Sequence, residues 1–359
     1  MADYQELRNQ FIKELDLEPC FVDTVFATLV GNRFPGDPLW VMIVAEPGSG
    51  KTEAIRCATG MVRGDLVEWR DKLTVNTLVS HFKTAEGKPS ASLLPKLANK
   101  VFIVKDFSTI FSMQPRDQQA ILGQLHACYD GNYGSSSGLP NDQIYDVKFG
   151  FLGVSNLLID HHILFFRELG DRFLYHRPVL DCTNEVLERI LNDSARADAR
   201  RATLGTASRH LLKQEFKVPS VDRAALDTIK TLSREVARLR CPVIRHYYRR
   251  FVEVHPTPEQ PSRIALQLKK LALGLCALDI DPIPILRRIA GDSIPPVRLS
   301  ILKQLGDEPV EVETLLAPSG AVRQETIHDL KLLGIIRVEG KPAKVSLAAP
   351  LELTKKGAS

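Results

Sequence analysis

The sequence predicts an α/β fold, in which a parallel β-sheet core is followed by a helical region and a small C-terminal unit. Three observations support this prediction. The apolar run 39–44 leads directly into a glycine-rich loop, and a second strand-like run, 100–106, ends in a carboxylate. Residues 182–290 have a helical pattern throughout, whereas residues 294–359 change character and suggest short helices and a β-hairpin.

The composition is that of an ordinary globular protein, with 359 residues, 44% of them hydrophobic and 25% charged. The net charge of +4 permits a nucleic-acid partner without arguing for one. Six scattered cysteines with no CxxC pair suit a reducing interior and disfavour a zinc site or a disulfide framework. No apolar run approaches the roughly 18 to 20 residues that span a bilayer, so we expect a cytoplasmic protein with no membrane partner.

The first apolar run is preceded by residues 1–35, which have the apolar spacing of two helices, and is followed by the loop 45–52. This loop has a Walker A pattern with alanine at its first position. In such a loop the backbone N–H groups bind phosphate, Lys51 reaches the β- and γ-phosphates, and Thr52 coordinates Mg²⁺. We therefore predict a site for ATP and Mg²⁺. Its binding residues are Glu46, Pro47, Gly48, Ser49, Gly50, Lys51 and Thr52.

The second strand-like run ends in Asp106, with Lys105 before it and Phe107 after it. In a Walker B arrangement, an aspartate binds Mg²⁺ and a neighbouring residue orients the attacking water. Two alignments are open. We favour Asp106 as the metal-side carboxylate without an adjacent base; alternatively, Asp106 occupies the base position behind Lys105. A third interpretation is that Asp106 only caps the strand end.

An amphipathic helix at 116–129 is followed by residues 132–148, which have the composition of a hairpin with a Gly/Ser/Pro/Asn tip. The next predicted strand, 149–154, ends at Ser155 and Asn156. An asparagine at this strand tip, beside the Walker B strand, is well placed to hold the attacking water or the γ-phosphate.

Two arginines are further candidates. Arg172 lies at the head of a new strand and faces away from its own loop in this topology, so it is a candidate finger for the γ-phosphate bound by a neighbouring subunit. Arg263 lies in the first turn of a helix after the proline-rich break 255–261. Because positive charge there opposes the helix dipole, we expect an anionic partner.

Residues 234–251 combine arginines with aromatic side chains. Two interpretations are open: the segment tracks a phosphate backbone, or it is a solvated helix face.

The C-terminal unit is predicted to contain helices at 296–305, 311–316 and 321–333 and then two short strands around Gly340. This is the pattern of a winged helix-turn-helix, whose third helix usually enters the DNA major groove. Many such domains bind protein instead, so both partners stay open. The predicted DNA contacts are Arg323, Gln324 and Thr326 on the third helix, and Lys341 and Lys344 on the wing.

Taken together, the order of these motifs resembles an AAA+ ATPase: a P-loop NTPase core with a parallel sheet, a helical lid and a winged helix-turn-helix. The hairpin before the Asn156 strand is similar to that of MCM-type helicases and related proteins of bacterial mobile elements. The resemblance implies N-terminal helices at 1–35, a nucleotide-binding core at 36–180, a lid at 181–293 and the winged helix at 294–359. The implied catalytic residues are Lys51, Asp106, Asn156 as sensor 1, Arg172 as the finger acting in trans, and Arg263 as sensor 2.

The resemblance implies a ring-forming homo-oligomer, such as a hexamer, that couples ATP hydrolysis to movement along DNA. Two departures weigh against fast translocation: the Asp-Glu pair is missing, and the hairpin tip 135–141 lacks a lysine, leaving Lys148 on the return strand as the basic residue for DNA. The alternatives are an ATP-switched DNA-binding regulator or helicase loader, and an AAA+ subunit whose winged helix docks a partner protein.

Overall fold

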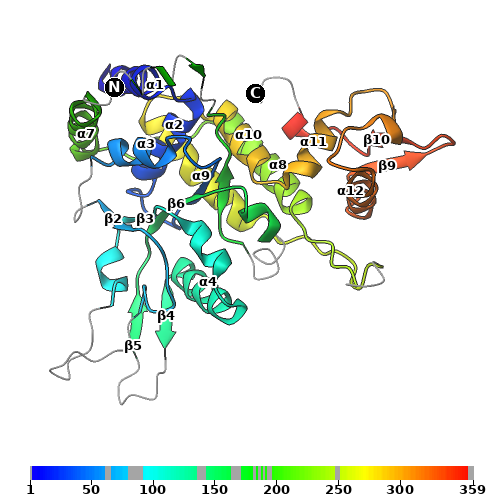
Figure 1. The fold of residues 1–359 in the computed structure, drawn as a ribbon, viewed down its shortest axis with the longest axis horizontal. Coiled ribbons are helices and arrows are strands. Elements are labelled where there is room, and N and C mark those ends of the chain that lie inside the picture. Colours follow the sequence, from blue (N-terminus) through cyan, green and yellow to red (C-terminus); the bar gives the residue numbers. More distant parts are fainter. Residues whose placement is uncertain are drawn as a thin grey trace.

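The computed structural model describes residues 2–60, 66–79, 92–135, 143–162, 171–180, 183–184, 187–188, 191, 196–246 and 251–354 (Figure 1). Its central element is a five-stranded sheet in the order β2-β3-β6-β1-β7, with every neighbouring pair parallel. The predicted α/β class with a parallel sheet is therefore confirmed. The strands are β1 (Trp40–Val44), β2 (Val67–Arg70), β3 (Val101–Val104), β6 (Gly150–Ser155) and β7 (Leu174–His176).

The sheet has a separate apolar cluster on each face, because successive side chains of a strand point to opposite sides. On one face, Trp40, Phe102 and Phe151 pack with α4 (Pro115–Asp130). On the other face, Val41, Ile43 and Ile103 belong to a cluster that continues into the helices. All five residues of β1 are buried, which explains its uninterrupted apolar run.

The helices on the second face come from segments before, within and after the strands of the sheet. They are α1 (Ala2–Leu15), α2 (Pro19–Gly31), α3 (Lys51–Ala58), α7 (Ala197–Lys213), α8 (Arg223–Leu239), α9 (Ser262–Ala277) and α10 (Pro282–Asp292). The backbones of α2 and α9 lie very close, since a Cβ added to Gly274 would meet the Ala27 carbonyl oxygen at 2.1 Å. The N-terminal helices therefore share their core with the helical region.

The predicted hairpin 132–148 is present as the antiparallel pair β4 (Asn132–Ser135) and β5 (Gln143–Asp146), and its tip, 136–142, lies outside the described residues. The hairpin follows α4, which ends at Gly131 in a left-handed conformation (φ 93°). Figure 1 shows it pointing away from the helical layer. Two 3-10 helices, η1 (Leu94–Leu97) and η2 (Phe107–Ser112), flank β3.

The C-terminal unit has a three-stranded antiparallel sheet in the order β8-β10-β9. Its elements are α11 (Pro296–Lys303), β8 (Val310–Glu311), η4 (Val312–Thr314), α12 (Gly320–Leu332), β9 (Ile336–Glu339), β10 (Lys344–Leu347) and η5 (Glu352–Thr354). The predicted helix at 311–316 is wrong, because Val310 and Glu311 pair with β10 and leave room for only one 3-10 turn.

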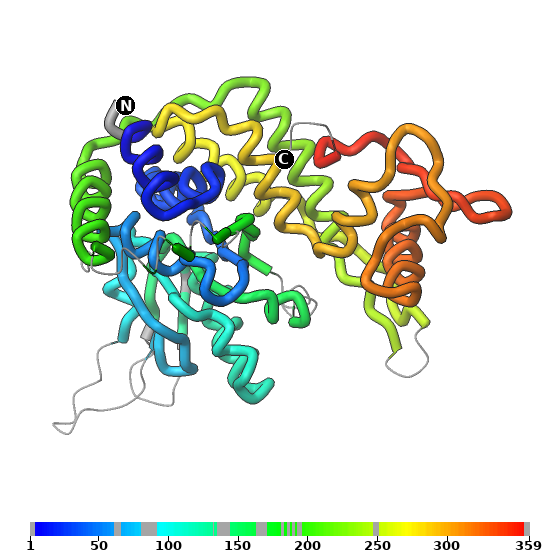
Figure 2. Tube along the Cα trace, turned by 45° about the horizontal axis from the view of Figure 1, so that its top comes forward, coloured from blue at the N-terminus to red at the C-terminus, as the bar shows by residue number. Residues whose placement is uncertain are grey.

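Buried polar contacts attach this unit to the helical region. Arg298 donates hydrogen bonds to the carbonyl oxygens of Leu239 and Cys241, at 2.8 and 2.7 Å. The carboxylate of Glu235, on α8, accepts from the backbone N–H groups of Glu352 and Leu353. Figure 2 shows the unit at the far end of the molecule from α7.

Candidate functional site

The loop between β1 and α3 has two glycines with left-handed backbone, Gly48 (φ 80°) and Gly50 (φ 77°). Their positive φ angles favour glycine, and a Cβ built on either one meets no atom within 4 Å, so the space around these positions is open. Glu46, Pro47 and Gly48 are exposed. The loop therefore presents its backbone outward at the N-terminus of α3, which is a favourable position for an anion.

Lys51 is buried, and its ammonium group donates hydrogen bonds to the carbonyl oxygens of Ala45 (2.7 Å) and Glu46 (2.6 Å). Burial lowers the pKa of Lys51, and the negative charges of Glu46 and Asp106 act in the opposite direction. The charge of Asp106 therefore acts on the Lys51 ammonium, so these two predicted site residues interact electrostatically. Neutral carbonyls hold this ammonium, so phosphate oxygens can replace them.

Asp106 follows β3 and is exposed. It caps η2, accepting hydrogen bonds from the backbone N–H of Ser108 at 3.1 Å and from the Ser108 hydroxyl. Lys105 turns away to pair with Asp71 at 2.6 Å. Among the described residues no group of three His, Cys, Asp or Glu side chains could hold a metal ion. Mg²⁺ bound by Thr52, Asp106, phosphate oxygens and water would not need such a group.

Asn156 follows β6, the strand between β1 and β3. Its side-chain oxygen accepts a hydrogen bond from the backbone N–H of Leu158 at 2.9 Å, which leaves the amide NH₂ as the group that can donate to a ligand. The register pairs Val44 with Ser155, so the loop after β1 and Asn156 start at the same level. Lys51, Thr52, Asp106 and Asn156 therefore all lie at the carboxyl edge of the sheet, where open α/β sheets bind ligands.

Arg172 and Arg263 lie at the opposite, amino edge. Arg172 precedes β7, and the five residues of β1 separate the two edges by about 16 Å. Gln267 of α9 accepts from the Trp40 N–H at 3.0 Å and donates to the Arg172 carbonyl at 2.9 Å, which puts the first turns of α9 at this edge. Burial lowers the pKa of Arg172, and the charge of nearby Arg263 lowers it further.

The Arg172 side chain is largely covered by its own chain, with 12% of its surface exposed. Its guanidinium lies 3.5 Å from the Asp130 carboxylate and 5.9 Å from the centre of the Tyr129 ring. Next to it, burial and the charge of Arg172 lower the pKa of His126 to about 4. In this conformation the Arg172 guanidinium is held against its own chain.

Sequence reasoning missed the role of Arg240. It is almost fully buried, donates to the carbonyl oxygens of Asp171 and Phe173, and pairs with Glu259 at 2.6 Å. Arg245 is also covered by ion pairs with Asp329 and Glu325. These two arginines are therefore structural, and neither interpretation of 234–251, as a phosphate-tracking face or as a solvated helix face, holds for them. Residues 247–250 lie outside the described part of the chain.

The predicted DNA contacts divide into two groups. Thr326 is buried on the side of α12 that also carries Leu330, and its hydroxyl donates to the Val322 carbonyl, so the prediction that it contacts DNA is wrong. Arg323 and Gln324 are both held by Glu313. The other predicted contacts, Lys341 and Lys344 of the β9–β10 hairpin and Lys148, are exposed, and Lys148 pairs with Asp37 at 2.9 Å.

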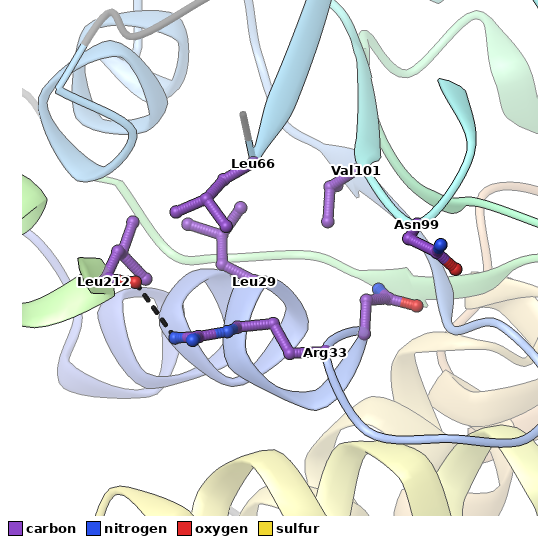
Figure 3. A pocket seen from close by; sticks show the side chains of 7 residues that line it. Leu29, Arg33, Leu66, Asn99, Val101 and Leu212 are labelled. Atoms are coloured by element: carbon purple, nitrogen blue, oxygen red, sulfur yellow. Dashed lines mark hydrogen bonds between the residues drawn. The ribbon is translucent and has the colours of Figure 1, made fainter. Parts of the chain in front are cut away.

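A small pocket lies at the amino edge between the end of α2, the end of α7 and the starts of β2 and β3 (Figure 3). Arg33 crosses it and donates to the Leu212 carbonyl at 2.9 Å. With a volume of about 10 Å³ it has room for one water molecule, so it is not a substrate site.

No protein-family model matches this chain, and no curated protein matches it significantly. Across the described helices, none combines the length and the apolar character needed to cross a membrane.

Proposed function

We propose that this chain is an AAA+ ATPase that binds ATP and Mg²⁺ at the carboxyl edge of its sheet and acts on DNA. The observation that carries the proposal is the convergence of Lys51, Asp106 and Asn156 behind a loop with two left-handed glycines. Lys51 would bind the triphosphate, and Thr52 and Asp106 would hold the magnesium ion, which neutralises charge on the phosphates.

The positions of Arg172 and Arg263 support a site shared between subunits. Both residues lie at the edge of the sheet opposite their own loop, about 16 Å away along β1, which favours contact with a triphosphate bound by a second copy. We therefore propose a homo-oligomeric ring, such as a hexamer, in which these arginines face the nucleotide of the neighbouring subunit.

For residues 294–359 we propose a winged helix-turn-helix, supported by the order of α11, η4, α12 and the β9–β10 hairpin. Lys341 and Lys344 would contact DNA phosphates from the exposed hairpin, and Lys148 would do so near the base of the β4–β5 hairpin. The complete assembly would be an MCM-like helicase or translocase.

One observation favours a second candidate, an ATP-switched DNA-binding regulator or helicase loader. Arg172 is held against Asp130 in the single chain, so the proposed finger has to leave an ion pair before it can act. Without a glutamate beside Asp106, hydrolysis is expected to be slow, which suits a switch better than a motor.

The test is the rate of ATP hydrolysis by the purified chain with no DNA, with single-stranded DNA and with double-stranded DNA, at two salt concentrations. If the protein is a motor, DNA should stimulate ATP hydrolysis, and higher salt should weaken this stimulation. The protein should also displace a strand from a forked substrate. The regulator predicts ATP binding without strand displacement. Absence of ATP binding would contradict both, and a rate indifferent to DNA would favour a protein partner.

A further inference from the structure

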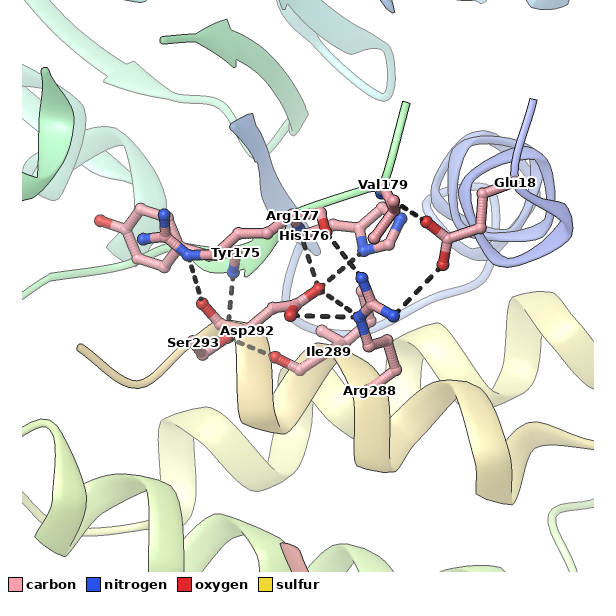
Figure 4. A network of polar contacts seen from close by, with 9 residues as sticks. All are labelled: Glu18, Tyr175, His176, Arg177, Val179, Arg288, Ile289, Asp292 and Ser293. Atoms are coloured by element: carbon pink, nitrogen blue, oxygen red, sulfur yellow. Dashed lines mark hydrogen bonds and ion pairs between the residues drawn. The ribbon is translucent and has the colours of Figure 1, made fainter. Parts of the chain in front are cut away.

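A polar network joins the end of β7 to α10 and to the start of α2 (Figure 4). Its centre is the buried carboxylate of Asp292, which contacts His176 Nδ1 at 3.0 Å and accepts from the Arg177 backbone N–H at 2.8 Å and from Arg288 Nε at 3.0 Å. Arg288 also lies 3.4 Å from Glu18. Burial alone would raise the pKa of Asp292, but the hydrogen bond and charge of His176 and the charge of Arg288 keep it below its usual value.

Arg177 extends this network to the candidate site. Its two terminal nitrogens donate to the two carboxylate oxygens of Asp160, at 2.9 and 2.6 Å, while its Nε donates to the Asp292 carbonyl at 3.1 Å. A two-pronged arginine–carboxylate contact fixes orientation as well as distance. Asp160 is therefore held in a defined position relative to α10.

Asp160 belongs to the turn that begins at Asn156. The Asn156 side-chain oxygen accepts from the Leu158 N–H at 2.9 Å, the Ile159 N–H donates to the Asn156 carbonyl, and the Asp160 N–H donates to the Leu157 carbonyl. Ile159, which lies between Asn156 and Asp160 in the sequence, is fully buried. The turn is thus anchored at both ends, by its own hydrogen bonds at Asn156 and by Arg177 at Asp160.

We propose that Arg177 is a positioning residue for Asn156: through Asp160 it holds the turn after β6 and joins it to α10. This inference depends on the proposed function, in which the Asn156 amide faces the nucleotide. A shift of about 1 Å in a positioned group can cost on the order of 100-fold in rate, so removing this anchor should affect turnover more than binding.

The test compares Arg177→Gln, Asp160→Asn and the double variant with wild type, measuring kcat and KM for ATP hydrolysis and the affinity for a slowly hydrolysed ATP analogue. We expect each single variant to lower kcat about 10- to 100-fold, with analogue affinity within about twofold of wild type. The double variant should be no slower than the slower single variant, because both changes break one contact. Arg177→Lys, which keeps the charge but not the fork, should recover part of the lost rate.

Arg287→Gln is the matched control, because Arg287, on α10, also makes a part-buried arginine–carboxylate pair, with Glu352, away from the turn. It should leave kcat within about twofold of wild type. When it is combined with Arg177→Gln, the fold-changes in kcat of the two variants should multiply. If Arg177→Gln does not fold, Asp160→Asn decides, since Asp160 is partly exposed and its removal leaves the contacts of Arg177 to Asp292 in place. Unchanged kcat in Asp160→Asn with an active wild type would overturn this inference alone. A wild type that neither binds nor hydrolyses ATP would overturn the proposed function together with it.

Discussion

Lys51 at the carboxyl edge of the central sheet and two arginines at the amino edge are held in different ways. At the carboxyl edge, Lys51 is held by two neutral carbonyl oxygens. At the amino edge, Arg172 and Arg240 are paired with the carboxylates of Asp130 and Glu259. A lysine can exchange neutral carbonyls for phosphate oxygens at small cost, whereas an arginine must leave a charged partner. Lys51 is therefore ready to bind an anion, whereas Arg172 must first leave its carboxylate partner.

The largest effect is expected at the carboxyl edge. Lys51→Ala should abolish ATP turnover and weaken ATP binding, because it removes the cation at the β- and γ-phosphates. The measurement is phosphate release, with binding of a fluorescent ATP analogue as a second readout. Lys105→Ala is the control, since Lys105 turns toward Asp71 and should leave both quantities near wild type. Turnover that survives in Lys51→Ala would remove this edge as the site.

At the amino edge, Arg172→Ala should lower turnover by about 10³ or more while ATP binding stays close to wild type, as expected for a finger that acts in trans. Arg33→Ala is a suitable comparison, because Arg33 is also part-buried near this edge, where it donates to the Leu212 carbonyl and lies over the Phe216 ring. If both arginine variants lose turnover equally, the loss reflects stability and not a role for Arg172 in the site.

A smaller effect is expected for DNA binding. Lys341→Gln and Lys344→Gln should each reduce the slope of log affinity against log salt by about 1, because each removes one phosphate contact. Arg323→Gln should leave the slope unchanged, since Arg323 is already neutralised by Glu313. Equal slopes for all three variants would place the DNA contact elsewhere.

The smallest effect concerns pH at the amino edge. The pKa of His126 is about 4 in the folded chain, below its usual value of 6.5, so the unfolded state binds more protons between these values. Stability should therefore fall as the pH decreases from about 6.5 to 4. His126→Gln should flatten the dependence of Tm on pH in this window, measured by thermal unfolding. An unchanged slope would mean that other groups dominate it.

Strands β1, β3, β6 and β7 and the residues that follow β1 and β3 could be predicted from the sequence, because each depends on a local pattern, whereas no strand was predicted at β2. An apolar run followed by a glycine-rich loop or a carboxylate specifies β1 and β3 together with Lys51 and Asp106. The register then brings Asn156 to the same edge.

Contacts between distant residues could not be predicted in this way. Arg240 belongs to a segment that is basic and aromatic, and only the fold shows that Asp171 and Glu259 surround it. Thr326 has the spacing of an exposed helix face, but α12 turns it toward the core. Arg177 carries no sequence signal, because its partners Asp160 and Asp292 are 17 and 115 residues away.

The most direct test of a site shared between two copies is to mix Lys51→Ala with Arg172→Ala and to measure ATP hydrolysis as a function of their ratio. Each variant alone should be inactive. In a mixed ring, the intact loop of an Arg172→Ala subunit can meet the intact arginine of a Lys51→Ala subunit, so activity should return and be highest near equal amounts. No activity at any ratio, from variants shown to assemble together, would contradict it.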